Sequence, residues 1–122
     1  NYCAEVDTLI LTAGHDVDRL REPVQIDVSV EGDRQTQMSG EPKEILAGDM
    51  VMRDAGGISC SIIYGQDHRS PITPETTHAL YVAYAPEGVP AEAVERHLGA
   101  IEANVRLFSP GAVLEQLTVI RA

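Results

Sequence analysis

The sequence predicts an α+β fold with a mainly antiparallel sheet and packed helices. Three observations support this prediction. Apolar and polar residues alternate strictly over 24–30, which is typical of a strand. Three further apolar runs of strand length follow at 50–52, 58–64 and 78–85, with turn residues between them. Helical spacing occurs only near the two ends of the chain, so helices and strands are segregated rather than alternating as βαβ units.

The first predicted element is a helix over 2–12, where apolar residues recur at helical spacing and Ala13–Gly14 supplies a stop signal. Asp16 and Asp18 then favour a turn or a new helix start. A carboxylate at such a position can accept hydrogen bonds from unpaired backbone N–H groups.

The alternating run over 24–30 predicts a half-buried strand with its valines and isoleucine on the inner face. A turn at 31–34 follows, and we expect 34–38 to be the antiparallel partner of this strand in a hairpin. Residues 39–49 are predicted to form a loop.

The three apolar runs predict three strands, and residues 54–57 form a tight glycine-rich turn between the first two. Residues 64–77 connect the second strand to the third. Pro71 and Pro74 exclude a regular strand or helix in this connection, because proline fixes its own φ and lacks a backbone donor.

The C-terminal part predicts an amphipathic helix that packs on a sheet, because apolar residues recur at intervals of four, three and four. These residues are Val94, Leu98, Ile101 and Val105. Ser109, Pro110 and Gly111 end the helix, and residues 113–120 are predicted to form a last strand.

The length of 122 residues predicts a single domain over 1–122. The chain begins at Asn1 rather than at a methionine, which is compatible with the C-terminal part of a longer or processed chain. The sequence contains no signal peptide and no apolar run of membrane-spanning length, so we expect no membrane partner and a cytoplasmic location.

The charge balance disfavours independent binding of a nucleic acid. Nineteen Asp and Glu residues against nine Lys and Arg give a net charge of −10, which repels a polyanion. With one Phe and no Trp, the chain also lacks the aromatic platform on which single strands stack. We therefore expect tRNA to bind only with a partner that supplies positive charge.

Neither the cysteines nor the first histidine predicts a metal centre, and no cofactor is expected. Cys3 and Cys60 do not form a C-x-x-C pair, and Cys60 lies in an apolar run where a buried thiol is the usual outcome. His15 stands beside two aspartates, but the glycine and distal glutamate of a calcium loop are missing. A turn or capping role for Asp16 is the simpler interpretation.

Residues 64–77, YGQDHRSPITPETT, form the segment richest in functional side chains, and we call it the polar segment. Its predicted ligand-binding residues are Tyr64, Gln66, Arg69, Thr73 and Thr76. Arg69 carries a rigid fork of donors that suits a carboxylate or phosphate. The alternative is a solvated loop in which Asp67 pairs with Arg69 and the threonines cap turns.

Among the four histidines, only His68 is surrounded by other functional groups. His97 lies between Arg96 and Leu98 at the edge of the apolar helix face, where we expect a structural role. His78 precedes a strand and could face either side.

The order of these motifs resembles the tRNA-editing domain of the phenylalanyl-tRNA synthetase β subunit and its free-standing relatives. The resemblance covers GHDVD at 14–18, then AGDMVMRDAGGISCSIIYGQDHRSPITPETT at 47–77, then an apolar strand. Its most specific parts are Gly48-Asp49-x-Val51, Asp54-x-x-Gly57 and Gln66-x-x-Arg69-Ser70-x-Ile72-Thr73-x-x-Thr76.

The resemblance implies an α+β domain with a cleft that accepts a mischarged aminoacyl end and hydrolyses it, while the rest of a synthetase holds the tRNA. It implies that residues 66–76, with Asp16 and Asp54, line this cleft, and that the ligand is an amino-acid-like small molecule. Ester hydrolysis needs a positioned proton acceptor. We expect this role to fall to His68, to His15 or to a water positioned by Asp16.

Two alternatives remain open. Residues 61–65 are apolar where many relatives carry arginine and tryptophan, which favours a pocket used in small-molecule biosynthesis without tRNA, with Tyr64, His68 and Asp16 as acid–base groups. The chain could instead be a non-catalytic subunit that completes the fold of a partner chain, or a homo-oligomer.

Overall fold

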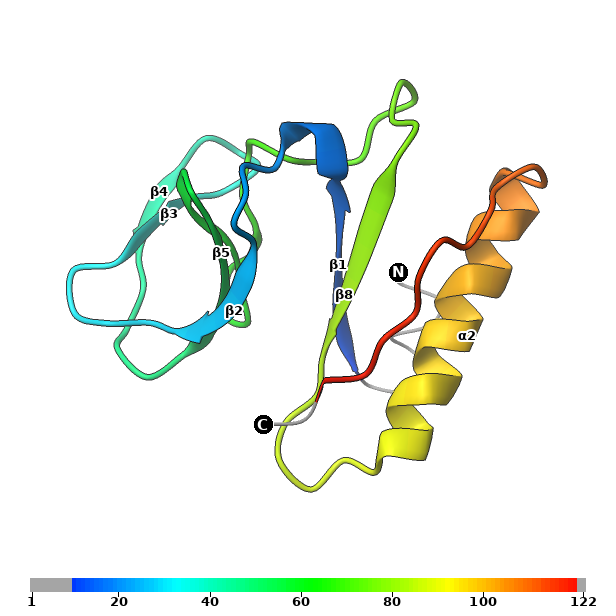
Figure 1. Cartoon of the computed structure of the whole chain (residues 1–122). Coiled ribbons are helices and arrows are strands. Elements are labelled where there is room, and N and C mark those ends of the chain that lie inside the picture. Colours follow the sequence, from blue (N-terminus) through cyan, green and yellow to red (C-terminus); the bar gives the residue numbers. More distant parts are fainter. Residues whose placement is uncertain (1–9, 121–122) are drawn as a thin grey trace. The chain divides into compact units, whose positions relative to one another are not determined.

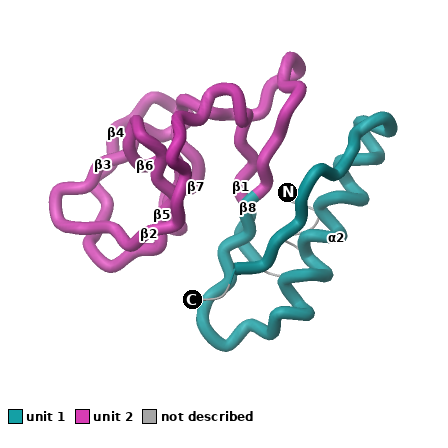
Figure 2. The backbone as a smooth tube through the Cα atoms, viewed as in Figure 1, with its two compact units in different colours: residues 1–12, 82–122 teal, residues 13–81 magenta. Residues whose placement is uncertain are grey.

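The computed structural model describes residues 10–120 and has the mixed α+β architecture that the sequence predicts, with antiparallel sheets and one long helix (Figure 1). The chain divides into two compact units (Figure 2). Unit 1 comprises residues 1–12 and 82–122, and unit 2 comprises residues 13–81.

Unit 2 is built on a four-stranded antiparallel sheet in the order β2-β5-β6-β7. Its strands are β2 (Gln25–Val28), β5 (Met50–Asp54), β6 (Gly57–Ser61) and β7 (Gly65–Gln66). Strands β5 and β6 form the predicted hairpin across the glycine-rich turn, with a register shift between Met52 and Arg53. The polar segment therefore begins at this sheet, because β7 lies within it.

The predicted hairpin between 24–30 and 34–38 is wrong. Strand β2 pairs with β5 instead, with Ile26 opposite Met52. Arg53 on β5 explains this choice, because its guanidinium bonds the carboxylates of both Asp27 and Asp33. The ion pairs join β2 and the turn after it to β5.

A second small sheet pairs β3 (Arg34–Thr36) with β4 (Pro42–Glu44). The prediction of a loop over 39–49 is therefore wrong for 42–44. The proline at the start of β4 and the shortness of the strand hide it in the sequence, because proline usually signals a turn.

The predicted half-burial of residues 24–30 is also wrong. The four apolar side chains of this run are exposed by 38% to 60% of their area: Val24, Ile26, Val28 and Val30. The core of unit 2 lies elsewhere, in a cluster of Ile45, Val51 and Ile58 against which Tyr64 packs. Cys60 is fully buried, as predicted, whereas Cys3 lies outside the described residues.

Strands β1 (Leu11–Asp16) and β8 (Ala79–Tyr84) form a two-stranded sheet. Most of the helix predicted over 2–12 lies outside the described residues, and its last two residues belong to β1, so the prediction is wrong there. Gly14 is not a stop signal: an added Cβ would lie 2.8 Å from the Ile72 Cδ1 atom, so the residue allows a close approach inside unit 2.

The predicted role of Asp16 as a cap is confirmed. After β1 the chain forms one short 3₁₀ turn, η1 (Val17–Arg19). The Asp16 side chain accepts a hydrogen bond of 3.1 Å from the backbone N–H of Asp18.

Unit 1 contains the predicted helix, α2 (Ala91–Phe108). His97 and Ile101 are its buried residues, and the His97 ring bonds the Thr12 hydroxyl, which confirms the expected structural role of His97. The strand predicted over 113–120 is wrong: this part of the chain has no regular structure and most of its side chains are exposed, including those of Val113 and Ile120.

Candidate functional site

The polar segment is a fixed loop rather than a free one. Backbone bridges join Asp67 to Gln37 and Pro71 to His15. The Asp67 N–H donates to the Ser59 carbonyl at 2.9 Å, and the Gln66 side-chain amide donates to the Ser70 carbonyl at the same distance. Three separate parts of unit 2 therefore hold the middle of the segment in place.

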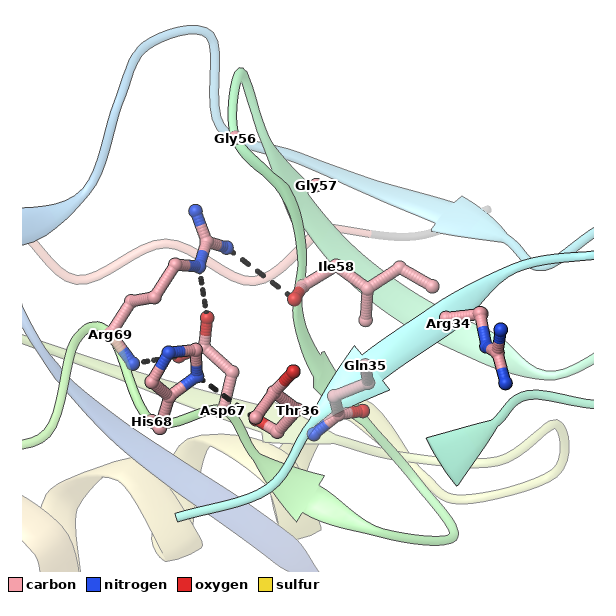
Figure 3. A pocket seen from close by; sticks show the side chains of 9 residues that line it. All are labelled: Arg34, Gln35, Thr36, Gly56, Gly57, Ile58, Asp67, His68 and Arg69. Atoms are coloured by element: carbon pink, nitrogen blue, oxygen red, sulfur yellow. Dashed lines mark hydrogen bonds and ion pairs between the residues drawn. The ribbon is translucent and has the colours of Figure 1, made fainter. Parts of the chain in front are cut away.

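Arg69 is the centre of this region. Its Nε donates to the Asp67 carboxylate at 2.5 Å and its Nη1 donates to the Asp54 carboxylate at 3.0 Å. Its Nη2 donates to the Ile58 carbonyl at 3.4 Å (Figure 3). These bonds use three of the five guanidinium N–H groups, which leaves two for a ligand.

Asp54 holds Arg69 from the side of the β5–β6 turn. Burial raises the pKa of Asp54, but hydrogen bonds from the Arg21 N–H, the Arg69 guanidinium and the Gly56 N–H outweigh this and lower the pKa below its ordinary value. The carboxylate is therefore ionised at neutral pH. Gly56 leaves room for this arrangement, because a Cβ would lie only 2.2 Å from Arg69 Nη1 and would displace the guanidinium.

A hollow of about 190 Å³ lies beside Arg69. It is lined by nine residues from three parts of unit 2: Arg34, Gln35, Thr36, Gly56, Gly57, Ile58, Asp67, His68 and Arg69. Figure 3 shows the Arg69 guanidinium near the Ile58 carbonyl and the His68 ring beside Thr36, with Arg34 on the far side. The lining is mainly polar and carries both signs of charge.

His68 is exposed, and its Nδ1 lies 3.3 Å from the Thr36 carbonyl. A carbonyl only accepts, so Nδ1 carries the proton in this contact. The lone pair of a neutral ring is then on Nε2. His68 therefore combines access to the hollow with a nitrogen that can accept a proton.

Three other predicted site residues gather around the end of β1. The Thr76 hydroxyl donates to the Asp16 carboxylate at 2.9 Å and accepts the Thr73 N–H at the same distance. Arg19 lies 3.7 Å from the same carboxylate. These contacts form a capped turn, and none of the three residues lines the hollow.

His15 is fully buried, and its Nδ1 lies 2.8 Å from the Ser70 hydroxyl. Burial lowers the pKa of His15, and the carboxylates of Asp67 and Asp54 only partly offset this, so the ring is neutral at neutral pH. Its Nε2 is buried and has no hydrogen-bond partner among residues 10–120. A ligand in the hollow does not reach this ring.

The structure thus brings only some of the predicted site residues to the hollow. His68 and Arg69 line the hollow and Asp54 holds Arg69, whereas Tyr64 packs on the core and Gln66 holds the Ser70 carbonyl. The catalytic and ligand-binding roles themselves stay predictions.

The sequence alone does not predict the contribution of 34–36 and 56–58 to the hollow. Residues 34–36 carry no local signal, because only the Gln37–Asp67 bridge brings them to the polar segment. The Gly56–Gly57 pair was recognised as a turn, and its lack of side chains was the available signal for space beside Arg69.

Within residues 10–120, no three side chains of the His, Cys, Asp and Glu types gather as a metal site requires. The same part of the chain contains no helix that is long and apolar enough to span a membrane.

A scan against protein-family models and a search of the curated proteins found no match for this sequence. The resemblance to an editing domain therefore stays a prediction.

Proposed function

We propose that the chain is a free-standing domain of the synthetase-editing type, whose hollow binds an amino-acid-like or aminoacyl group and hydrolyses its ester. One observation supports this most directly. The hollow brings His68 and Arg69 of the polar segment, and through Arg69 also Asp54, to one place. Arg69 and Asp54 belong to the motifs on which the resemblance depends, and His68 occupies an unspecified position inside one of them.

The size of the hollow agrees with a small ligand. Its volume of about 190 Å³ corresponds to roughly six water molecules at about 30 Å³ each. Pockets for drug-sized molecules are larger, roughly 300–1,000 Å³. An aminoacyl group fits this volume, whereas a nucleotide stays outside it.

Binding of the aminoacyl group without the nucleotide agrees with the net charge of −10. A partner would have to hold the tRNA, because the acidic chain repels a polyanion. A cytoplasmic location belongs to the same proposal, because aminoacyl-tRNA is used there.

In the proposed reaction, His68 Nε2 removes a proton from a water molecule as the water attacks the ester carbonyl carbon. The two remaining Arg69 N–H groups bind the carbonyl oxygen and stabilise its developing negative charge. The bond to the leaving oxygen then breaks, and His68 returns the proton to that oxygen. The products are the free amino acid and the released hydroxyl.

Deacylation of mischarged aminoacyl-tRNA and of simple amino acid esters tests this proposal. We expect His68→Ala to lower kcat by about 10²–10⁴-fold, which is the usual contribution of a general base. His78→Ala is the matched control, because His78 is also exposed but does not line the hollow. Absence of both hydrolysis and ligand binding in the wild-type chain would show that the proposal is wrong.

A pocket that serves small-molecule biosynthesis without tRNA is the second candidate. The exposure of Ile62 and Ile63, by 37% and 54%, favours it, because an apolar surface next to the polar segment does not attract a polynucleotide. Native mass spectrometry of the purified chain distinguishes the two: a copurifying metabolite, together with no effect on aminoacyl-tRNA, supports the second candidate.

A role as a non-catalytic subunit is the third candidate, and the exposed apolar side chains of residues 24–30 favour it. An apolar face of this kind is typical of a surface that a partner chain or a second copy covers. Sedimentation of the chain alone tests this candidate. A stable, well-folded monomer counts against it.

A further inference from the structure

We propose that His15 and Ser70 are positioning residues for Arg69, and that they act through Asp67. This inference rests on the proposed function in one respect: Arg69 is taken to be the group that contacts the ligand. The hydrogen bonds that carry it are independent of any ligand.

The four side chains form a continuous series of hydrogen bonds. His15 Nδ1 lies 2.8 Å from Ser70 Oγ, and Ser70 Oγ donates to Asp67 Oδ1 at 3.2 Å. The other carboxylate oxygen of Asp67 accepts from Arg69 Nε at 2.5 Å. A fully buried imidazole is thereby connected to a guanidinium at the edge of the hollow.

The direction of each bond follows from the chemistry of the groups. The Asp67 carboxylate accepts from the Arg69 guanidinium and from Ser70, so the single hydroxyl proton of Ser70 points to Asp67. The Ser70 oxygen must then accept the proton that His15 carries on Nδ1. The structure therefore specifies the Nδ1–H form of the neutral ring and leaves Nε2 as a buried acceptor, in agreement with the absence of a partner for that atom.

Burial makes this arrangement rigid. His15, Asp67 and Ser70 are each exposed by 1% or less, so water does not compete for their bonds. Asp67 also accepts from the backbone N–H groups of Arg69 and Ser70, at 3.2 and 3.4 Å. The carboxylate that orients Arg69 thus has all its donors supplied by the protein.

An unsatisfied acceptor such as His15 Nε2 has an unfavourable effect on folding, and an apolar residue at position 15 would avoid it. A role in orienting Ser70 explains why an imidazole occupies this position. Phenylalanine preserves the ring but lacks the donor, whereas the side-chain amide nitrogen of asparagine can replace Nδ1–H. These two substitutions separate the hydrogen bond from the packing.

The test is solution NMR of the ligand-free chain, with the Arg69 Nε–H signal and the His15 ring nitrogens as readouts. We expect His15 to be in the Nδ1–H form. Loss of the donor in His15→Phe should make the Arg69 Nε–H exchange with water at least about tenfold faster, as expected when a bond to a charged group is weakened. His15→Asn should restore slow exchange.

His97→Phe is the matched control, because His97 is equally buried but bonds Thr12 in unit 1. It should leave the Arg69 signal unchanged. If His15→Phe does not fold, Ser70→Ala interrupts the same series and should give the same faster exchange. An unchanged Arg69 signal in the folded variant, an Nε2–H form of His15, or an equal effect of His97→Phe would overturn the inference.

A ligand measurement separates this inference from the proposed function. The Km for an amino acid ester should rise in His15→Phe and recover in His15→Asn, with the larger change in Km than in kcat. If no ester is bound or hydrolysed but the NMR results are as expected, the positioning of Arg69 holds and the proposed function fails.

Discussion

Substitution of Gly56 by alanine is the sharpest test of the geometry around Arg69. The added Cβ would lie 2.2 Å from Arg69 Nη1 and 3.2 Å from Asp54 Oδ1. The separation from Arg69 Nη1 is sterically forbidden and the separation from Asp54 Oδ1 is tight, so the guanidinium must move away from Asp54. The Asp54 side chain is exposed by only 1%, so water does not replace the lost bond.

The expected loss follows from the bond that breaks. A hydrogen bond between charged groups contributes roughly 1.5–3 kcal/mol, so we expect the free energy of unfolding to fall by about 2 kcal/mol. With a urea dependence of about 2 kcal/mol per molar, the midpoint should fall by about 1 M. Urea denaturation followed by circular dichroism measures this directly.

Two controls make the result specific. Gly99→Ala adds the same methyl group to α2, where the added Cβ meets no atom of residues 10–120 within 4 Å apart from its chain neighbours and the helix backbone. This control should raise the free energy of unfolding by up to about 1 kcal/mol. In an Arg69→Ala background, Gly56→Ala should lose its effect, because the obstructed group is gone. A Gly56→Ala variant as stable as the wild type would refute the reasoning about this contact.

Three further predictions concern the protonation of His15, the ion pairs of Arg53 and the exposed side chain of His68. Because burial lowers the pKa of His15, the unfolded chain binds a proton below about pH 6.5 that the folded chain does not bind. The urea midpoint of the wild type should therefore fall as the pH is lowered from about 7 to about 5. The fall should be smaller in His15→Asn. Arg53→Ala removes the ion pairs with Asp27 and Asp33, so the pKa of both carboxyls should rise toward ordinary values. NMR titration of the carboxyl groups measures this, and an unchanged pKa of Asp33 would contradict the pairing. His68→Ala should change stability by no more than about 0.5 kcal/mol, because the side chain is exposed; a larger loss in urea denaturation would assign it a structural role.

Local patterns in the sequence predicted the elements whose signals are local. The helix over 91–108 and strands β5, β6 and β8 are predicted correctly because apolar periodicity and the 54–57 turn are visible within a few residues. Strand pairing was not predictable in the same way. Arg53 selects β5 as the partner of β2 by bonding two aspartates that are distant in sequence, and no local pattern contains that information.

The candidate site is likewise only partly predictable from local sequence. The polar segment is recognisable from its composition. The alternative interpretation is correct about the Asp67–Arg69 pair but wrong about a solvated loop, since Asp67 is buried. The two interpretations are compatible because the pair fixes Arg69 at the edge of a hollow. Residues 34–36 could not be assigned to the hollow, because their position depends on long-range bridges.

The central claim is that the hollow beside His68 and Arg69 binds an aminoacyl group. The most direct measurement is an NMR titration of the chain with amino acid amides, which resemble the esters but resist hydrolysis. We expect saturable shifts confined to residues 34–36, 56–58 and 67–69, and their loss in Arg69→Ala. Shifts located on β2 or α2, or no shift with any amide, would contradict it.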